Sequence, residues 1–178
     1  MLSKKPISAD NQQERIDFAS WVVGYVDGEG CFSVSIIRNS TSRLGWQVFP
    51  EFVVTQGAKS LNTLEDLKKF FQCGSIVENK RKDNHKESLY KYCVRSNKDL
   101  QEIIIPFFNK YKLRTAKKKD FKLFVKILSI IEKGEHLKQK GLFKIASKIE
   151  KMNRQIQHKF QLSSETIRQA ANNKKQKI

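Results

Sequence analysis

Apolar positions repeat with two different periods at the start of the chain. Over residues 14–27 they recur at three- and four-residue spacing, which predicts a helix capped by Asp10 or Asn11. From residue 31 the stretch CFSVSIIRN alternates apolar and polar side chains, which predicts a strand. Gly28 and Gly30 lie between the two periods and are expected to end the helix. The core face of the strand would carry Phe32, Val34 and Ile36.

A second strand is predicted over 46–56, in WQVFPEFVVTQ, after the polar turn STSRLG. Its even-numbered positions form the expected core face, and its odd-numbered positions form the exposed face. Pro50 stands in the middle of this strand, where it offers no backbone N–H to the ladder. A bulge or a bend is therefore expected at this position.

Further helices and strands complete the pattern. A helix is predicted over 59–72, followed by strands over 75–82 and 88–96. The last helices are predicted over 97–111, 116–134 and 141–156, the first of them bent or broken by Pro106. This order predicts an α+β domain with one four-stranded antiparallel sheet, helices on one face and the other face open. The expected parts are a tail over 1–13, a single domain over 14–160 and a basic tail over 161–178.

The charge of the chain points to a polyanionic partner. Its 35 Lys and Arg residues against 18 Asp and Glu give a formal charge of +17, which exceeds what solubility requires. Residues 1–60 are neutral, with six basic and six acidic side chains. Residues 110–159 carry sixteen basic and four acidic side chains. Double-stranded DNA is the leading partner, because an open antiparallel sheet face fits the major groove.

Other compositional features predict an intracellular protein without a membrane partner. No apolar run approaches the roughly 20 residues that cross a bilayer. The N-terminal stretch lacks the apolar middle of a secretion signal. Cys31, Cys73 and Cys93 are far apart in the sequence and are interpreted as reduced thiols. An organelle (chloroplast or mitochondrion) and a bacterial cytoplasm both stay open as the compartment.

The junction between the first helix and the first strand carries a motif. It reads Val22-Val23-Gly24-Tyr25-Val26-Asp27-Gly28-Glu29-Gly30. Gly24 and Gly28 share one helix face, where a second such helix could approach backbone to backbone. The motif, its strand context and the VVTQ ending of the second strand resemble the LAGLIDADG homing endonucleases over roughly residues 14–135. The stretch LSSETIRQA near the C-terminus is similar to the tail of the homodimeric members.

This resemblance implies a fold and a function. The fold is αββαββα, with a four-stranded antiparallel DNA-binding sheet and helices on one face. The function is that of an intron-encoded, site-specific double-strand DNA endonuclease, which hydrolyses phosphodiester bonds at a long pseudo-palindromic target and leaves short 3′ overhangs. One copy of the motif occurs, and cutting two strands needs two active sites, so a homodimer is expected. Its interface would contain Val23, Gly24, Asp27 and Gly28.

The resemblance also implies catalytic residues. Glu29, at the second acidic position, is the expected metal ligand, with Gly28 beside it, and Mg²⁺ is the expected ion, with Mn²⁺ as a substitute. Gln56 matches the family's water-organising residue, and Lys117 is our choice among residues 117–119 for the lysine before the long helix. Asp27 is expected to have a structural role, accepting hydrogen bonds from backbone donors at the turn.

One position departs from the family pattern. Some homodimeric members carry an arginine four residues after the Gln56 position, where this chain has Ser60 preceded by Lys59. Which of the two replaces the basic partner stays open.

Side chains on the open sheet face and at the hairpin tip are expected to contact DNA. The expected residues are Ser33, Ser35, Ile37, Arg38, Asn39, Gln47, Phe49, Glu51, Asn79, Arg81 and Lys91, with Lys119 as a contact from the lysine run.

Two other functions stay open from the sequence. The chain could be an RNA maturase that assists splicing of its own intron, or a catalytically silent DNA-binding module. Retention of Glu29 argues against the silent module. No P-loop, histidine cluster or Ser-His-Asp arrangement supports a different catalytic scheme.

Overall fold

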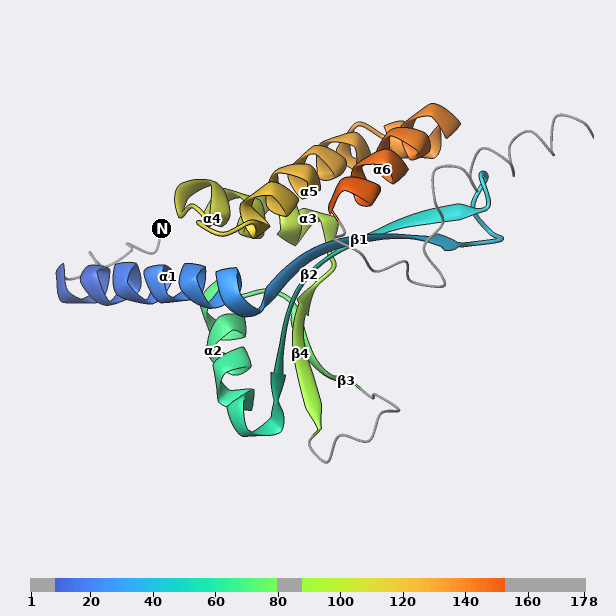
Figure 1. Cartoon of the computed structure of the whole chain (residues 1–178). Helices are drawn as coiled ribbons and strands as arrows, with labels where there is room; N and C mark the ends of the chain where they lie inside the picture. The colour runs from blue at the N-terminus through green and yellow to red at the C-terminus, as the bar shows by residue number, and fades with distance from the viewer. Residues whose placement is uncertain (1–8, 80–87, 153–178) are drawn as a thin grey trace, which may run out of the picture.

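The computed structural model describes residues 9–79 and 88–152 (Figure 1). The first half contains α1 (Ala9–Glu29), β1 (Gly30–Arg38), β2 (Trp46–Gly57), α2 (Leu61–Phe71), β3 (Ser75–Asn79) and β4 (Leu89–Val94). The second half contains α3 (Asn97–Asp99), a π-helical turn (Leu100–Ile104), α4 (Ile105–Lys110), α5 (Lys117–Glu132) and α6 (Gln139–Met152). Short 3₁₀ turns occupy Ala58–Ser60 and Glu135–Leu137. The predicted α+β order is confirmed.

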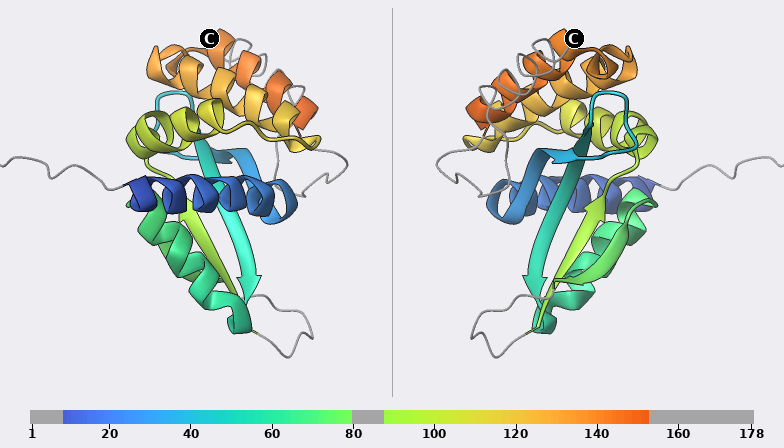
Figure 2. Two further views of the ribbon diagram at one scale, coloured as in Figure 1. Left: turned by 90° about the vertical axis from the view of Figure 1, so that its left-hand side faces the viewer. Right: turned by 90° about the vertical axis from the view of Figure 1, so that its right-hand side faces the viewer.

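The four strands form one antiparallel sheet in the order β1-β2-β4-β3. In Figure 2 the left-hand view shows helices in front of the strands, and the right-hand view shows strands in front. The helices therefore cover one face of the sheet, as expected from an antiparallel sheet with one open face. We call the uncovered face the open sheet face.

The alternation in β1 was predicted correctly. Phe32, Val34 and Ile36 are buried under the helices, whereas Ser33 and Ser35 point to the open sheet face. Phe32 stacks on Phe52 of β2 with ring centroids 5.1 Å apart and meets Phe108 of α4 at 5.4 Å. These rings fix the start of β1, directly after the motif, against the core.

The motif joins α1 to β1 through a tight turn at Gly30. A Cβ added at Gly30 would lie 2.6 Å from Cγ1 and 2.9 Å from the carbonyl oxygen of Val26. Val22 and Val26 are fully buried at 0% exposure, so the last turns of α1 are held firmly in the core. Asp27, Gly28 and Glu29 consequently occupy a fixed place at one end of the sheet.

Several predicted boundaries and bends were wrong. The first helix begins at Ala9 and not near residue 14, so Asp10 and Asn11 lie inside it and do not cap it. Pro50 causes no bulge, because the β1–β2 register runs without interruption through the Val34–Pro50 pair. β4 pairs with β2 only from Phe52 onward, so β2 has a single neighbour at Pro50, where a missing N–H is tolerated.

Pro106 does not break its helix. The chain stays helical from the π-helical turn Leu100–Ile104 into α4, which begins one residue before the proline. A proline clashes with the carbonyl four residues earlier, and a widened turn relieves this contact. The long helix was predicted well: α5 ends at Glu132, and Gly134 follows with a φ of +66°. No described helix combines the length and apolarity needed to cross a membrane.

Some predictions lie outside the described residues. These include residues 80–87, which contain Arg81, as well as the expected C-terminal tail over 161–178. Most of the expected N-terminal tail over 1–13 also lies there, and its last residues belong to α1.

Candidate active site and nucleic-acid interface

Asp27 ties the end of α1 to the segment that precedes α5. Its carboxylate accepts hydrogen bonds from the backbone N–H of Arg114 at 2.7 Å and from the hydroxyl of Thr115 at 2.8 Å, with the Thr115 N–H at 3.3 Å. Both residues are 87 or more positions away in the sequence. Asp27 therefore accepts from backbone donors, as expected, but these donors lie in a distant loop and not at the turn, where the sequence led us to expect them. This connection brings the start of α5 to the motif.

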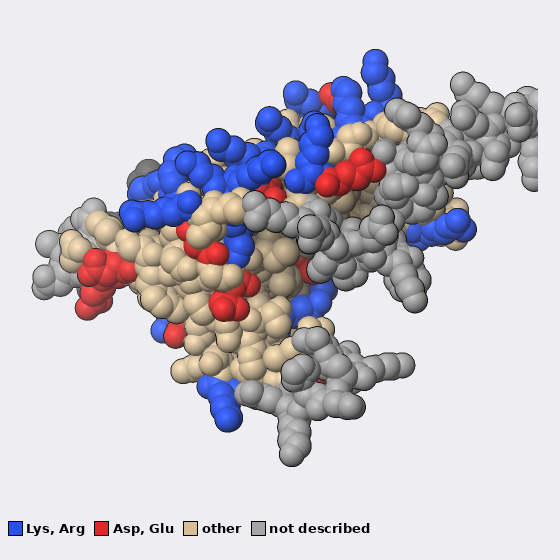
Figure 3. All heavy atoms as spheres, viewed as in Figure 1, with Lys and Arg blue, Asp and Glu red and all other residues tan. Residues whose placement is uncertain are grey.

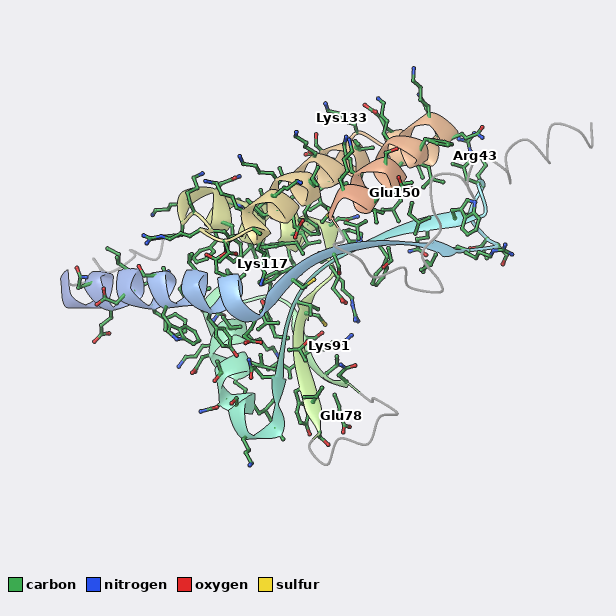
Figure 4. The ribbon with its side chains drawn as sticks, in the orientation of Figure 1. Arg43, Glu78, Lys91, Lys117, Lys133 and Glu150 are labelled. Carbon is green, nitrogen blue, oxygen red and sulfur yellow. The ribbon has the colours of Figure 1, made fainter. Side chains whose placement is uncertain are left out.

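Lys117 is the lysine that reaches the motif. Its Nζ donates to the carbonyl oxygens of Val26 at 2.8 Å and Gly28 at 3.1 Å. These carbonyls belong to the last turn of α1, where the helix dipole favours a cation. Lys118 and Lys119 are exposed. Among residues 117–119, the structure places Lys117 beside the acidic motif (Figure 4).

Burial lowers the pKa of Lys117 below its ordinary value. The negative charges of the carboxylates of Asp27 and Glu29 act in the opposite direction and favour the ammonium form. Cys31 lies close by on β1, and burial raises the pKa of its thiol. The site thus concentrates one cation and several acidic groups around the α1–β1 turn.

Glu29 presents a carboxylate to solvent at this turn. Within the described ranges its side chain makes no hydrogen bond and no ion pair. The hydroxyl of Tyr25 is buried without a hydrogen-bond partner, and burial followed by the charge of Glu29 raises the pKa of Tyr25. The side chain of Gln56 approaches the same hydroxyl and lowers this pKa, although the contact does not reach hydrogen-bond geometry. Glu29 and Gln56 thus both lie near the Tyr25 hydroxyl.

The donor atoms at this turn suit a hard cation. Glu29 offers carboxylate oxygens, and Gly28 offers a carbonyl oxygen that already accepts from Lys117. Across the described residues there is no group of three or more His, Cys, Asp and Glu side chains that could hold a metal alone. Glu29 and Gly28 offer a small set of oxygen ligands, which fits an ion that keeps water and phosphate oxygens in its shell.

The outer face of α1 is open at its two glycines. A Cβ added at Gly24 or Gly28 would meet no atom of residues 9–79 and 88–152 within 4 Å. A groove of about 370 Å³ runs beside Gly24 and is lined by Ser20, Val23, Gly24, Asp27, Tyr111, Lys112 and Arg114. At Gly30 a Cβ would collide with Val26, which explains the glycine there. No such contact within the described residues explains Gly24 and Gly28. Glycine inside a helix costs roughly 1 kcal/mol relative to alanine, so their presence needs another explanation.

The strand register shows which side chains share the open sheet face. Ser33 lies opposite Glu51, Ser35 opposite Phe49 and Ile37 opposite Gln47. Because directly paired residues point to the same side, Lys91 and Asn79 join this face through the β2–β4 and β4–β3 pairs. The structure therefore gathers these expected contact residues on one surface.

Arg95 belongs to the open sheet face and was missed from the sequence. Its guanidinium forms an ion pair with Glu51 and lies over the ring of Phe49 at 5.7 Å. The period-two pattern of β4, continued from Lys91 through Cys93, would have placed it there.

The hairpin tip and the start of α5 hold the remaining expected contacts. The Arg38 guanidinium lies over the Trp46 ring at 5.3 Å. The amide of Asn39 donates to the Gln47 side chain at 3.0 Å, while its oxygen accepts from Thr41. Arg38 pairs with Trp46, so it points to the face opposite Ile37, at the exposed end of the hairpin.

The candidates for the basic partner, Lys59 and Ser60, lie on the 3₁₀ turn that follows β2.

Comparison with known proteins gives consistent matches. A family model described as LAGLIDADG endonuclease matches residues 22–128. The crystal structure of a homing endonuclease, I-TnaI, is 37% identical with a TM-score of 0.73, covering 87% of this chain and 96% of that chain. The structure of I-SmaMI bound to an uncleaved DNA target in the presence of calcium ions is 41% identical with a TM-score of 0.72, covering 87% of this chain and 48% of that chain.

A curated relative extends the comparison to intron-encoded proteins. "Probable intron-encoded endonuclease 2" of Neurospora crassa is 32% identical over 126 residues, which are 71% of this chain and 25% of that protein. The chain spans about a quarter of the length of the first curated relatives that it matches.

Proposed function

This chain belongs to the LAGLIDADG endonuclease family, and on that premise we propose that it is a site-specific, metal-dependent endonuclease for double-stranded DNA that acts as a homodimer. The observation that carries the proposal is the arrangement of Glu29, Gln56 and Lys117 around the end of α1, next to the open sheet face. The intron-encoded relatives support an origin within an intron.

The divalent ion would be held by Glu29 and by the carbonyl of Gly28. Mg²⁺ takes few protein carboxylates and completes its shell with water and phosphate oxygens, which agrees with the partial ligand set of one chain. Mn²⁺, which prefers the same oxygen ligands, would substitute. When bound, the ion supplies activation of the attacking water and stabilisation of the leaving 3′-oxygen.

Lys117 and Gln56 would act on the same phosphodiester from the protein side. A lysine ammonium has three N–H donors, and two of those on Lys117 are used by the carbonyls of Val26 and Gly28. The third can donate to a phosphate oxygen as negative charge develops there. The side-chain amide of Gln56 can accept a hydrogen bond from the attacking water and orient it.

A second copy of the chain would complete the active site. One chain brings one Glu29, and a double-strand cut needs two sets of ligands. The free glycine face of α1 gives the two copies a surface for close helix packing, with the two Glu29 carboxylates side by side at its end. Phosphate oxygens and cations between these carboxylates would offset their repulsion.

Target recognition would use the open sheet face. An antiparallel ribbon fits the major groove, where Ser, Asn and Gln side chains reach base edges. Two copies related by a two-fold axis would read a long, imperfectly palindromic target and leave short 3′ overhangs.

The test needs the candidate target, obtained by joining the exons that flank the open reading frame. Purified protein with Mg²⁺ should linearise a plasmid that carries this sequence. Glu29→Gln should bind the target and fail to cut it, because the substitution removes the charge of the metal ligand. Glu65→Gln, a matched change of an exposed acid on α2, should cut normally. Cutting by Glu29→Gln at the wild-type rate would refute the assignment, and intron splicing without cleavage would favour a maturase.

A further inference from the structure

Positive charge gathers on the side of the molecule away from the open sheet face. Figure 3 shows Lys and Arg side chains crowded over α4, α5 and α6. Figure 4 places Lys133 above the α5–α6 pair and Lys91 below it, beside β4. We define the outer lysine surface as six exposed side chains of α5, α6 and the turn between them: Lys122, Lys126, Lys133, Lys140, Lys144 and Lys151.

Helical periodicity explains why these lysines share one side. On α5, Lys122 and Lys126 are four positions apart, whereas Phe124 and Ile127 are fully buried on the opposite side. On α6, Lys140 and Lys144 repeat the same spacing. Like charges at this spacing destabilise a helix, so the arrangement has a cost in the isolated chain. Glu135 lies on this side and pairs with Lys144 at 3.3 Å.

The open sheet face has a different character. Its described basic residues include Lys91 and Arg95, and Arg95 is already paired with Glu51. Ser33, Ser35 and the other polar side chains there suit base edges better than phosphates. The charge of the outer lysine surface is therefore not accounted for by binding of a target on the open sheet face.

We propose that the outer lysine surface binds a second duplex nucleic-acid segment through its phosphates, independently of sequence. The proposal rests on the proposed function only in assigning the first duplex to the open sheet face. One protein, or each half of a dimer, would then hold two duplex segments on opposite sides of the sheet.

The chemistry of the surface selects duplex phosphate over other polyanions. Successive lysines on one helix face are about 6 Å apart. A duplex carries one negative charge per about 1.7 Å of axis, so its charge is dense enough to offer a phosphate to each lysine of such a row. An interfacial membrane helix also needs large apolar side chains beside its lysines. Among the described residues, the large exposed apolar side chains are Ile16, Trp21, Ile37 and Leu137, of which only Leu137, in the turn, is near. Proteins bind single strands with exposed aromatic side chains on which the bases stack. The outer lysine surface contains no aromatic side chain.

Two matched triple variants test the proposal in the full chain. Lys122→Gln, Lys126→Gln and Lys133→Gln remove three charges from the outer lysine surface. Lys68→Gln, Lys69→Gln and Lys98→Gln remove three exposed charges from α2 and α3. Fluorescence anisotropy would measure binding to a labelled random duplex of about 30 bp, as DNA and as RNA, between about 50 and 200 mM salt. Circular dichroism would verify that both variants are folded.

The expected result is a loss confined to the first variant. Its plot of log affinity against log salt should become shallower by about 2 to 3, since each lost phosphate contact removes about 0.9. The control should keep the wild-type slope. A loss with both duplexes identifies the shared phosphate chemistry, and a loss with only one identifies that duplex as the partner. Equal slopes for the two variants, whether both unchanged or both reduced, would overturn the proposal.

Cleavage separates this proposal from the proposed function. The outer triple variant should linearise the target plasmid as fast as wild type does at saturating protein. If the outer triple variant has a shallower salt slope and the wild type does not cleave, the second duplex site is supported and the endonuclease function is refuted. If the wild type cleaves normally and the outer triple variant keeps the wild-type slope, the endonuclease function is supported and the second duplex site is refuted.

Discussion

At the scale of single residues, Lys117 connects the fold to the proposed chemistry. Its pKa is lowered by burial, so the ammonium loses its proton at a lower pH than an ordinary lysine does. If the charged form stabilises the phosphate, the cleavage rate should fall as pH rises through this lowered pKa. Measured kcat against pH should show an alkaline limb below the ordinary lysine value. Lys117→Arg should move the limb upward or remove it, while Lys119→Arg should leave it in place.

Asp27 should matter more for stability than for the chemical step. Its carboxylate accepts three hydrogen bonds from Arg114 and Thr115. Asp27→Asn retains one acceptor oxygen and loses the charge, so the free energy of unfolding should fall by about 1–2 kcal/mol. Urea denaturation checks this. Glu29→Gln is the matched control, because that side chain makes no hydrogen bond within the described residues, and its midpoint should stay near wild type. Equal loss in both variants would contradict the role of Asp27.

Residue positions were predictable where a local pattern defines them. Strict alternation placed Phe32, Ser33 and their neighbours on the correct faces. The family resemblance pointed to residues 117–119, and Lys117, our choice among them, is the one whose Nζ reaches the carbonyls of Val26 and Gly28. The contact between Asp27 and Thr115 was not predictable, because it joins segments 88 positions apart and depends on how α5 packs. Arg95 was missed although its strand pattern was available.

At the scale of elements, Pro50 and Pro106 show what the sequence rules do not determine. The β1–β2 register stays regular at Pro50, because β2 pairs there with β1 alone and the missing N–H of the proline is tolerated. Which strand lies beside β2 depends on the order of the sheet, and alternation along one strand does not encode that order. Pro106 was expected to bend or break its helix, and a π-helical turn absorbs it. The type of each element was predictable, whereas the detailed response of the backbone depended on neighbouring elements.

Helix α1 carries the prediction for the pairing surface. A Cβ added at Gly24 would meet no atom of the described residues within 4 Å, so the folded monomer should tolerate Gly24→Leu. In a dimer the side chain would separate the two helices and move the two Glu29 carboxylates apart. The variant should sediment as a monomer or a loosened dimer, and it should nick the target plasmid and not linearise it. The Glu65→Leu variant, changed at an exposed position of α2, should remain dimeric. A Gly24→Leu dimer that cuts both strands normally would contradict the assigned interface.

At the scale of the whole molecule, the number of chains bound to each DNA target tests the dimeric mechanism. The chain matches 96% of I-TnaI but 48% of I-SmaMI, so its described fold corresponds in extent to a whole chain in one case and to half of one in the other. Under the proposed mechanism one chain supplies one Glu29, one Gln56 and one Lys117, a set that would hydrolyse one strand. Two chains of 20.7 kDa should therefore bind each full target. Sedimentation of the protein with a target duplex measures this ratio directly. A complex with one chain per duplex that still makes a double-strand break would require both cuts from a single set of ligands, and the dimeric mechanism would then be wrong.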